Sequence, residues 1–188
     1  MLIHKILIVA LALLPLTANA QTCQQGSITS TTPTNRFTDH ANGTVTDKET
    51  GLMWKKCHES QTWIEWDFNG FSGAGCADRP DKTYTWREAL EQAQTLNSAG
   101  GFAGHTDWRV PNINELASIV EEACFDPAIN LSVFGEAPLL SDDLWLSVWS
   151  SSPADYDDSA WLMEFSSGFN SAREKSTGLY VRLVRDAH

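Results

Sequence analysis

The stretch that decides the fold covers residues 85–116 and reads TWREALEQAQTLNSAGGFAGHTDWRVPNINEL. Thr85 and Glu88 stand three residues apart, which is the spacing of a capping box at the start of a helix. Apolar side chains then recur at helical spacing until a pair of glycines ends the pattern. Asn112 and Glu115 repeat the capping pattern ahead of a second apolar stripe. The stretch therefore predicts two helices.

Strand-like segments lie on both sides of these helices. The Asn42-Gly43 pair predicts a hairpin turn, because both residues tolerate positive φ. Short segments typical of strands occur at 44–46, 52–54, 145–152, 159–166 and 178–185. Helices in the middle of the chain with strands at both ends predict an α+β fold. In this fold two helices pack on an antiparallel sheet that joins the two ends of the chain.

Residues 55–84 have no clean periodicity and are predicted to form a long loop. Trp63, Trp66, Phe68 and Phe71 lie in this loop among glycines. Exposed aromatic side chains stack on sugar rings and anchor protein contacts, so these four are candidate ligand-binding residues. A small satellite core beneath the loop is the alternative. Other tryptophans lie in regular motifs and are expected in the core, namely Trp86, Trp108, Trp149 and Trp161.

The first twenty residues have the pattern of a secretory signal peptide. Lys5 gives a short positive region, residues 6–16 are almost all apolar, and Ala18-Asn19-Ala20 is a small-x-small cleavage site. Cleavage is expected before Gln21, and no later apolar run is long enough to span a membrane. The sequence thus predicts a signal peptide (1–20), an extended lead-in (21–35) and a single domain (36–188). Its location is predicted to be periplasmic or extracellular, without membrane insertion after cleavage.

Four cysteines remain after the predicted cleavage. An even number of cysteines in an exported domain indicates two disulfides, and four cysteines allow three pairings. Cys57 and Cys76 bracket the glycine-rich loop, which favours Cys57–Cys76 together with Cys23–Cys124. A metal site of cysteines is disfavoured, because the chain has no C-x2-C pair and no histidine at zinc-ligand spacing.

The charge balance excludes two classes of protein. The chain has 24 acidic and 13 basic residues, a net charge of −11 that becomes −12 when Lys5 leaves with the leader. Proteins that grip nucleic acid phosphates, or that lie on anionic membranes, need clustered Lys and Arg instead. No H-E-x-x-H, G-x-S-x-G, P-loop or dinucleotide motif occurs either, so the sequence predicts no enzyme.

An acidic cluster near the third strand-like region is a candidate calcium site. Asp155, Asp157 and Asp158 stand close together in a predicted loop, and Ca²⁺ takes six to eight oxygen ligands from such groups. The chain lacks a full D-x-[DN]-x-[DN]-G-x5-E loop. Solvated surface carboxylates are therefore the alternative to a bound Ca²⁺.

Six motifs occur in order along the chain: NGTVTDxxTGLMW (42–54), TWxxAL (85–90), GHTDWRVPNINEL (104–116), WSSSP (149–153), AWLMxF (160–165) and YVRLVR (180–185). Together they resemble the Lcl C-terminal domain family, also called DUF1566, over about residues 36–185. The resemblance implies an exported bacterial domain, found alone or at the ends of surface proteins that include a collagen-like adhesin. It also implies glycan or host-surface binding in at least one branch.

The segment W-R-x-P-x-x-x-E-L (108–116) is also similar to C-type-lectin-like and formylglycine-generating-enzyme-like folds. This similarity implies a C-type-lectin-like fold but carries no catalysis across, because the formylglycine enzymes use a reactive cysteine pair near the C-terminus. The present chain has no cysteine after Cys124.

These observations predict an exported, non-catalytic binding domain that meets a glycan or a surface protein. The expected contact regions are the 58–84 loop and the 142–158 loops. A net charge of −12 opposes sulfated glycans, so neutral sugars or a cation-bridged contact fit more easily. The alternatives are a periplasmic hydrolase or processing enzyme, and a structural or oligomerisation domain of the envelope.

Overall fold

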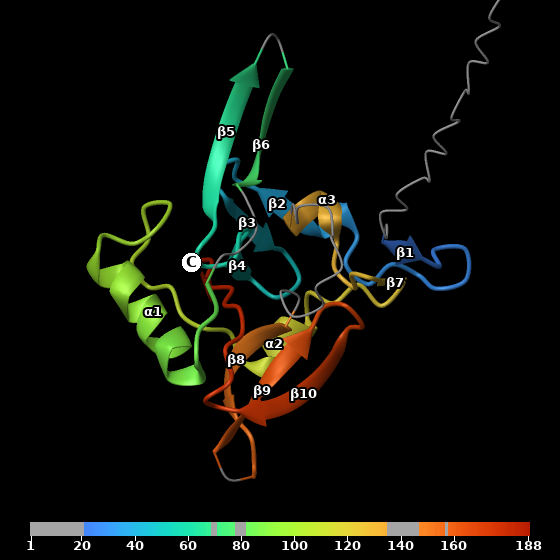
Figure 1. Ribbon diagram of the computed structural model, residues 1–188. Coiled ribbons are helices and arrows are strands. Elements are labelled where there is room, and N and C mark those ends of the chain that lie inside the picture. The colour runs from blue at the N-terminus through green and yellow to red at the C-terminus, as the bar shows by residue number, and fades with distance from the viewer. Residues whose placement is uncertain (1–20, 69–70, 78–81, 135–146, 157) are drawn as a thin grey trace, which may run out of the picture.

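A computed structural model describes residues 21–68, 71–77, 82–134, 147–156 and 158–188 (Figure 1). The strands are β1 (Thr22–Cys23), β2 (Phe37–Asp39), β3 (Thr44–Asp47), β4 (Leu52–Lys55), β5 (Thr62–Phe68), β6 (Phe71–Ala77), β7 (Cys124–Phe125), β8 (Ser147–Pro153), β9 (Ser159–Glu164), β10 (Phe169–Glu174) and β11 (Val184–Asp186). The helices are α1 (Trp86–Ser98), α2 (Ile113–Ala117) and α3 (Leu131–Phe134), with a 3-10 turn, η1, at Thr34–Arg36. Antiparallel sheets with few helices give the α+β class.

One sheet joins the two ends of the chain, as the sequence predicts. Its strand order is β11-β4-β3-β2, so the last strand pairs with the hairpin that follows the lead-in. The predicted strand at 178–185 is too long, because only Val184–Asp186 pairs along β4. The preceding residues cross between two sheets, and Leu179 and Tyr180 form single bridges to Tyr84 and Val148.

A second sheet has the order β10-β9-β8. Strands β8 and β9 lie where the sequence predicts them, but β10 was not predicted. Its residues, FNSARE, are exposed or half-buried throughout, so β10 lacks the apolar alternation that marks a strand with one buried face. Pairing with β9, from Phe169 opposite Glu164 to Glu174 opposite Ser159, holds β10 in place.

Both predicted helices begin at the predicted capping boxes. Thr85 and Glu88 bond reciprocally at the start of α1, and Asn112 and Glu115 do so at the start of α2. Helix α2 spans only five residues. The Arg109 guanidinium, which precedes it, donates to both carboxylate oxygens of Glu115 at 2.8 and 2.7 Å.

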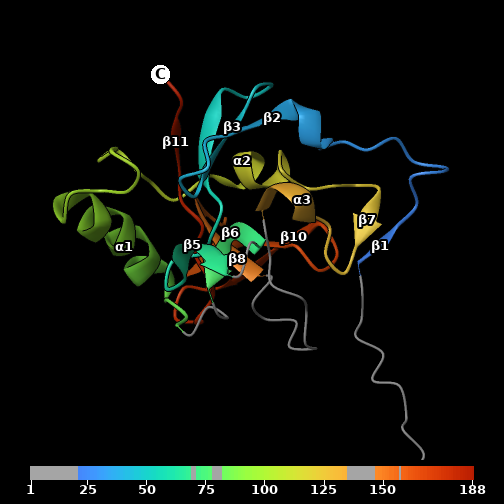
Figure 2. The ribbon, with the colours of Figure 1, turned by 90° about the horizontal axis from the view of Figure 1, so that it is seen from above.

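Strands β4, β8 and β9 each contain neighbouring buried residues that point into different cores. Trp54 lies in the core that α2 and α3 cover, whereas Met53 lies in the core that α1 covers. Val148 and Trp149 of β8 divide in the same way. Figure 2 shows α1 standing on one side, apart from α2 and α3. Packing into two cores explains why apolar residues stand next to each other in these strands instead of alternating with polar ones.

The prediction that four motif tryptophans lie in the core is half correct. Trp108 and Trp149 are buried. Trp86 and Trp161 are only half-buried, because Trp86 opens the first turn of α1 and Trp161 points out of β9. Trp86 packs against the core that α1 covers but leaves part of its ring exposed, and this affects the candidate site.

The prediction of a long loop at 55–84 was also wrong. Strands β5 and β6 form a hairpin that pairs continuously from Thr62 opposite Ala77 to Phe68 opposite Phe71, and we call it the arm. Gly73 and Gly75 hide the β pattern of β6 in the sequence, since glycine is unfavourable in strands. Figure 1 shows the arm projecting from the rest of the molecule.

Both predicted disulfides are present, Cys57–Cys76 and Cys23–Cys124. The first ties β6 to the chain just after β4, at the base of the arm. The second joins β1 to β7, which pair antiparallel with Cys23 opposite Cys124.

A buried carboxylate holds the lead-in against the domain. Glu121 is 3% exposed. It accepts hydrogen bonds from the Ser30 hydroxyl, from the backbone N–H groups of Thr31 and Ala123, and from both the N–H and the hydroxyl of Thr32. Burial by itself would raise the pKa of Glu121, but these donors outweigh burial and lower the pKa from 4.5 to about 2.

We predict that Glu121→Gln lowers the free energy of unfolding at pH 7 by about 3 kcal/mol. Because the folded-state pKa lies below the unfolded value of 4.5, the ionised carboxylate stabilises the fold above about pH 4.5. This contribution is lost as the pH falls toward 2. Urea unfolding of both proteins between pH 7 and pH 2 measures the difference.

The matched control for this experiment is Glu122→Gln, since Glu122 is the exposed neighbour of Glu121. The control should unfold like the wild type at every pH. The wild-type and Glu121→Gln stabilities should converge at low pH, and a gap between them that stays constant from pH 7 to pH 2 would contradict the assigned role.

Candidate functional site

The arm carries the four aromatic residues that the sequence singled out. Trp63 and Trp66 lie in β5, and Phe68 pairs with Phe71 across the hairpin. The side chains of Trp66, Phe68 and Phe71 lie outside the described part of the structure. The backbone register therefore places Phe68 opposite Phe71. Trp63 and Trp66 lie three residues apart in β5.

Trp63 anchors the arm to the domain. Its half-buried ring lies under the Lys56 ammonium, with Nζ 4.7 Å from the ring centroid. Lys56 Nζ also donates to the Asp39 carboxylate at 2.8 Å. Gly43 passes so close to Trp63 that a Cβ at this position would lie 2.8 Å from Cγ of the indole. Trp63 is thus enclosed by the hairpin turn that the Asn42-Gly43 pair predicts.

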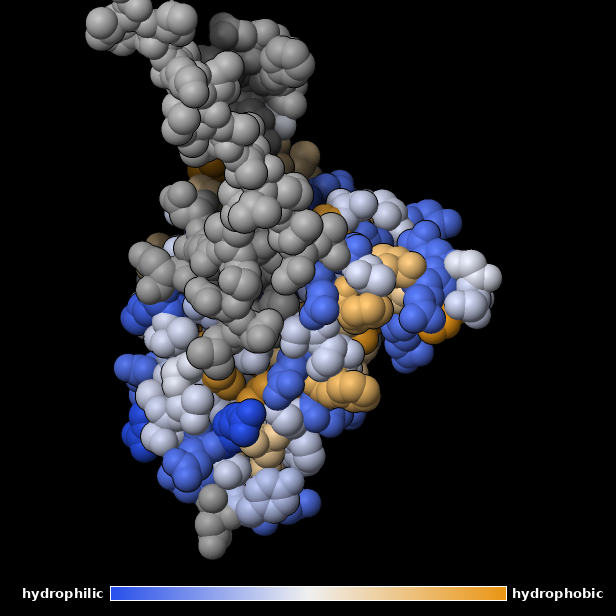
Figure 3. Space-filling model, turned by 45° about the vertical axis from the view of Figure 1, so that its right-hand side comes forward, coloured by the Kyte–Doolittle hydropathy of each residue, from blue (hydrophilic) through white to orange (hydrophobic). Residues whose placement is uncertain are grey.

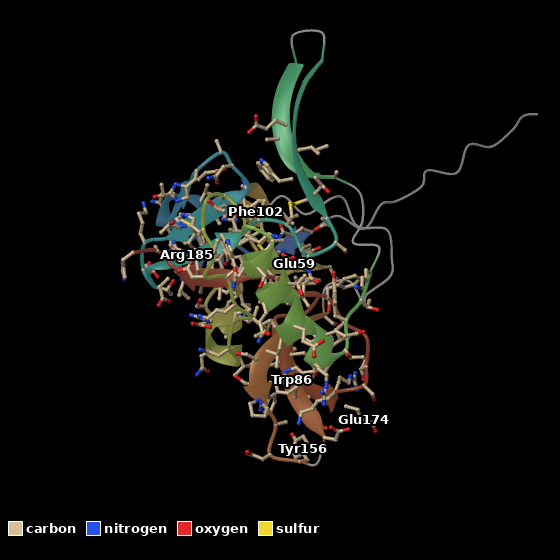
Figure 4. The ribbon with its side chains drawn as sticks, turned by 90° about the vertical axis from the view of Figure 1, so that its left-hand side faces the viewer. Glu59, Trp86, Phe102, Tyr156, Glu174 and Arg185 are labelled. Atoms are coloured by element: carbon tan, nitrogen blue, oxygen red, sulfur yellow. A yellow bond between two sulfur atoms is a disulfide. The ribbon has the colours of Figure 1, made fainter. Side chains whose placement is uncertain are left out.

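Charged side chains are buried beneath the arm. Lys55 and Glu59 form an ion pair of 2.5 Å between Nζ and Oε1, and both side chains are almost completely buried. Gln92 of α1 donates to the other carboxylate oxygen of Glu59 at 3.3 Å, and the Phe102 ring centroid lies 4.5 Å from Lys55 Nζ. Figure 4 shows Glu59 and Phe102 at the base of the arm. This cluster connects the arm with α1.

Arg182 joins the same region to the end of the chain. Its guanidinium is fully buried and donates to the carbonyl oxygens of Lys55, at 3.1 Å, and of Lys56. The other terminal nitrogen lies 3.2 Å from His58 Nε2. The backbone N–H of Glu59 donates to Val181 at 2.8 Å. Residues 55–59 are therefore held against residues 181–183 by both backbone and side-chain bonds.

A second candidate site lies toward the opposite end of the molecule, where Figure 4 shows Trp86, Glu174 and Tyr156. A cavity of about 540 Å³ opens there, and we call it the Trp86 cleft. Its described lining residues are Thr85, Trp86, Arg87, Leu90, Asp158, Lys175 and Ser176. The backbone N–H of Trp86 donates to the carbonyl oxygen of Lys175, and the backbone N–H of Lys175 donates to the carbonyl oxygen of Asp158. These backbone bonds hold three chain segments together.

The side chains of the Trp86 cleft combine a fixed apolar floor with free polar groups. Nε1 of Trp86 donates to the carbonyl oxygen of Ser150 at 2.8 Å, which fixes the ring beside Leu90. Lys175 Nζ lies 5.0 Å from the Trp86 ring centroid.

Four polar residues surround this floor. No other residue in the described ranges hydrogen-bonds to the side chains of Arg87, Asp158, Lys175 or Ser176. Two cations, one carboxylate and one hydroxyl are thus available to a ligand.

The predicted calcium site is not tested. Asp155 and Asp158 lie between β8 and β9, and Asp157 falls outside the described residues. Within the residues that the structure describes, no group of three His, Cys, Asp or Glu side chains is arranged to hold a metal. Calcium binding by Asp155, Asp157 and Asp158 stays a prediction.

Sequence patterns missed the Trp86 cleft because Trp86 fits the apolar stripe of α1. Its position supplies the signal that separates it from a core residue. Trp86 is the first residue of the helix, directly after the capping threonine, and its ring is only half-buried against the core. Lys175 and Asp158 come from turns of the second sheet, and no spacing in the sequence connects them with Trp86.

The family model of the Lcl C-terminal domain matches residues 43–185. The chain belongs to the Lcl C-terminal domain family. The matched region of this Lcl domain contains both the arm and the Trp86 cleft. A search of curated proteins finds no match to the chain.

The structure also bears on the compartment. The two disulfides of the chain are typical of proteins that fold in an oxidising compartment. In the described part of the chain, no helix has the length and apolar character needed to cross a membrane.

We predict that Gly43→Ala destabilises the Lcl domain by about 3 kcal/mol. The new Cβ would lie 2.8 Å from Trp63 and 2.9 Å from Phe102, and the backbone has a φ of +84°. Overpacking costs about 1–3 kcal/mol, and a left-handed conformation adds about 1 kcal/mol for alanine. Urea unfolding measures the loss, and proteolysis within the arm should become faster.

Gly104→Ala is the matched control, because Gly104 has a φ of +80° and nothing within 4 Å of the added Cβ. It carries the backbone strain without the contacts, so we expect a loss of about 1 kcal/mol and an unchanged rate of proteolysis in the arm. Equal losses for the two variants would show that Trp63 does not press against the turn.

Proposed function

We propose that this Lcl domain is an exported, non-catalytic binding domain that takes a saccharide unit of a surface glycan into the Trp86 cleft. The observation that carries the proposal is the pairing of a fixed indole with free polar side chains around it. A pyranose ring has an apolar C–H face and a rim of hydroxyls, and it binds where an aromatic surface lies beside hydrogen-bonding groups. The apolar surface of the cleft comes from Trp86 and Leu90. Its hydrogen-bonding groups come from Arg87, Asp158, Lys175 and Ser176.

The size and shape of the cleft support this assignment. A volume of about 540 Å³ falls within the range of small-ligand sites, about 300–1,000 Å³. Because the Trp86 ring is already fixed by its bond to Ser150, little side-chain entropy is lost when a sugar packs against it.

The charge of the cleft favours a neutral sugar. Arg87 and Lys175 are partly balanced by Asp158 within the cleft, and the protein as a whole carries a formal charge of −11 before any leader is removed. A long polyanion would meet repulsion outside the cleft. Hydroxyls of a neutral sugar can accept from the two cations and donate to the Asp158 carboxylate.

The choice of binding over hydrolysis rests on the carboxylates. Glycoside hydrolysis uses two carboxyl groups on opposite sides of the scissile bond. Among the described residues that line the Trp86 cleft, Asp158 is the single acid. A periplasmic hydrolase or processing enzyme therefore has less support than a binding domain.

Two further parts of the proposal come from the sequence. The signal peptide pattern of residues 1–20 supports export, and the resemblance of the W-R-x-P-x-x-x-E-L segment to C-type-lectin-like folds supports a fold of that kind. The two disulfides agree with export. A cell-surface or envelope partner is an alternative ligand, and the arm is the surface that would meet it.

A glycan array probed with residues 21–188 tests the proposal. We predict binding to neutral glycans that falls at least tenfold in Trp86→Ala, because the sugar loses its apolar platform. The fall should be about three- to tenfold in Arg87→Ala, since one charged hydrogen bond to a ligand contributes on the order of 1 kcal/mol. Arg87 is exposed, so this second variant keeps the test valid if Trp86→Ala does not fold.

Glu91→Ala is the control, since Glu91 is an exposed residue of α1 outside the lining of the cleft. It should bind like the wild type. Silence across neutral and acidic glycans, or binding that both cleft variants retain in full, would overturn the proposal.

A further inference from the structure

The arm has two strand edges that no other described strand covers. Strands β5 and β6 form a two-stranded sheet of their own, separate from the sheets of the domain. Figures 1 and 4 show the arm extending beyond the body of the molecule. A free edge presents a row of backbone N–H and C=O groups, which can pair with another extended chain.

The register shows which backbone groups face outward. Phe68 pairs with Phe71, and two residues connect them, so this is the closing pair at which backbone bonds are exchanged. Bonded and non-bonded pairs then alternate. The N–H groups of Ile64 and Trp66 point toward β6, whereas those of Trp63, Glu65 and Asp67 point to the outer edge of β5. Within the described ranges, no hydrogen bond reaches this outer edge.

The two faces of β5 differ in chemistry. Ile64 shares one face with positions 66 and 68, and its side chain is 40% exposed. Glu65 shares the other face with Trp63 and position 67, and the Glu65 side chain is exposed. A strand added at this edge would therefore meet the exposed Ile64 on one face and the exposed Glu65 carboxylate on the other.

We infer that the outer edge of β5 is a docking site for an extended segment of a partner protein in which basic and apolar residues alternate. The partner's backbone would bond to the outward groups of Trp63, Glu65 and Asp67. Its basic residues would lie on the face of Glu65, and its apolar residues would lie on the face of Ile64. This is strand addition, in which main-chain bonds give affinity and alternate side chains give specificity.

A second copy of this chain is a worse occupant than a basic partner. Two β5 strands that pair antiparallel about Glu65 would place the two Glu65 carboxylates directly opposite each other, and like charges in that position are destabilising. Strand β6 has an outer edge as well, but its residues FSGAGCA are mostly small and offer little contact for a partner's side chains. The charge and the side-chain size both favour β5.

The base of the arm is fixed to the domain. The Cys57–Cys76 disulfide and the enclosed ring of Trp63 fix the arm at its foot. A partner strand therefore meets an edge that is already extended, and binding loses less conformational entropy than it would with a free loop. The docking edge lies far from the Trp86 cleft, so the inference does not depend on the proposed glycan site.

The test uses an eight-residue peptide of alternating Lys and Val, with a Glu–Val peptide as its counterpart, and measures the Kd by calorimetry. We expect the Lys–Val peptide to bind and the Glu–Val peptide to bind at least tenfold more weakly. Glu65→Pro removes an outward N–H and the charge, and should weaken the Lys–Val peptide at least tenfold. Glu65→Gln keeps the N–H, and should weaken it only about two- to fourfold.

Ala74→Pro is the matched control, because Ala74 stands opposite Glu65 on β6 and its N–H faces the other edge. We expect its affinity to stay within twofold of the wild type. Amide exchange of Ile64 in each variant checks that the hairpin still pairs. No binding of the Lys–Val peptide, equal binding of the two peptides, or equal losses in Glu65→Pro and Ala74→Pro would each overturn the inference.

Discussion

The rest of the structure depends on one buried guanidinium. Arg182 lies completely inside the domain and donates to the carbonyl oxygens of Lys55 and Lys56. Desolvation of an arginine costs several kcal/mol unless its donors are bonded, so this side chain forces the end of β4 and the residues before β11 to lie together. The sheet that joins the two chain ends, the cluster beneath the arm and the cover of α1 all meet at this point. The arm is mounted on the frame that residues 55–59 and 181–183 form.

The arm and the Trp86 cleft lie toward opposite ends of the molecule, and their chemistry differs. The Trp86 cleft gathers Arg87 and Lys175 in a protein that is acidic overall, and it suits a small polar ligand with an apolar face. The arm presents an extended edge with the exposed Glu65 on one face, and it suits a basic segment of another protein. The arm and the Trp86 cleft lie apart in the molecule, so a ligand at one of them would not cover the other.

Sequence patterns predicted the features that depend on residues close together in the chain. Thr85 with Glu88 and Asn112 with Glu115 mark both helix starts, because a capping box is a local hydrogen-bond exchange. The disulfides could be assigned because Cys57 and Cys76 enclose one glycine-rich segment and leave Cys23 with Cys124.

Features that depend on distant contacts were missed. Strand β6 is rich in glycine and forms only because β5 pairs with it. The Trp86 cleft brings together residues from α1 and from two turns of another sheet. The position of Arg182 in an apparent strand conceals its burial, because alternation assigns it to a face but does not say what covers that face.

Native-state hydrogen exchange tests the central claim most directly, namely that residues 55–59 and 181–183 form the rigid frame on which the arm is mounted. The amide of Lys55 bonds to Leu183 and the amide of Glu59 bonds to Val181. These two amides should exchange only through global unfolding, with a free energy that matches the urea value. The inward amides of the arm, at Ile64 and Trp66, should exchange through a smaller opening. Exchange of Lys55 and Glu59 as fast as that of Ile64 would contradict this account.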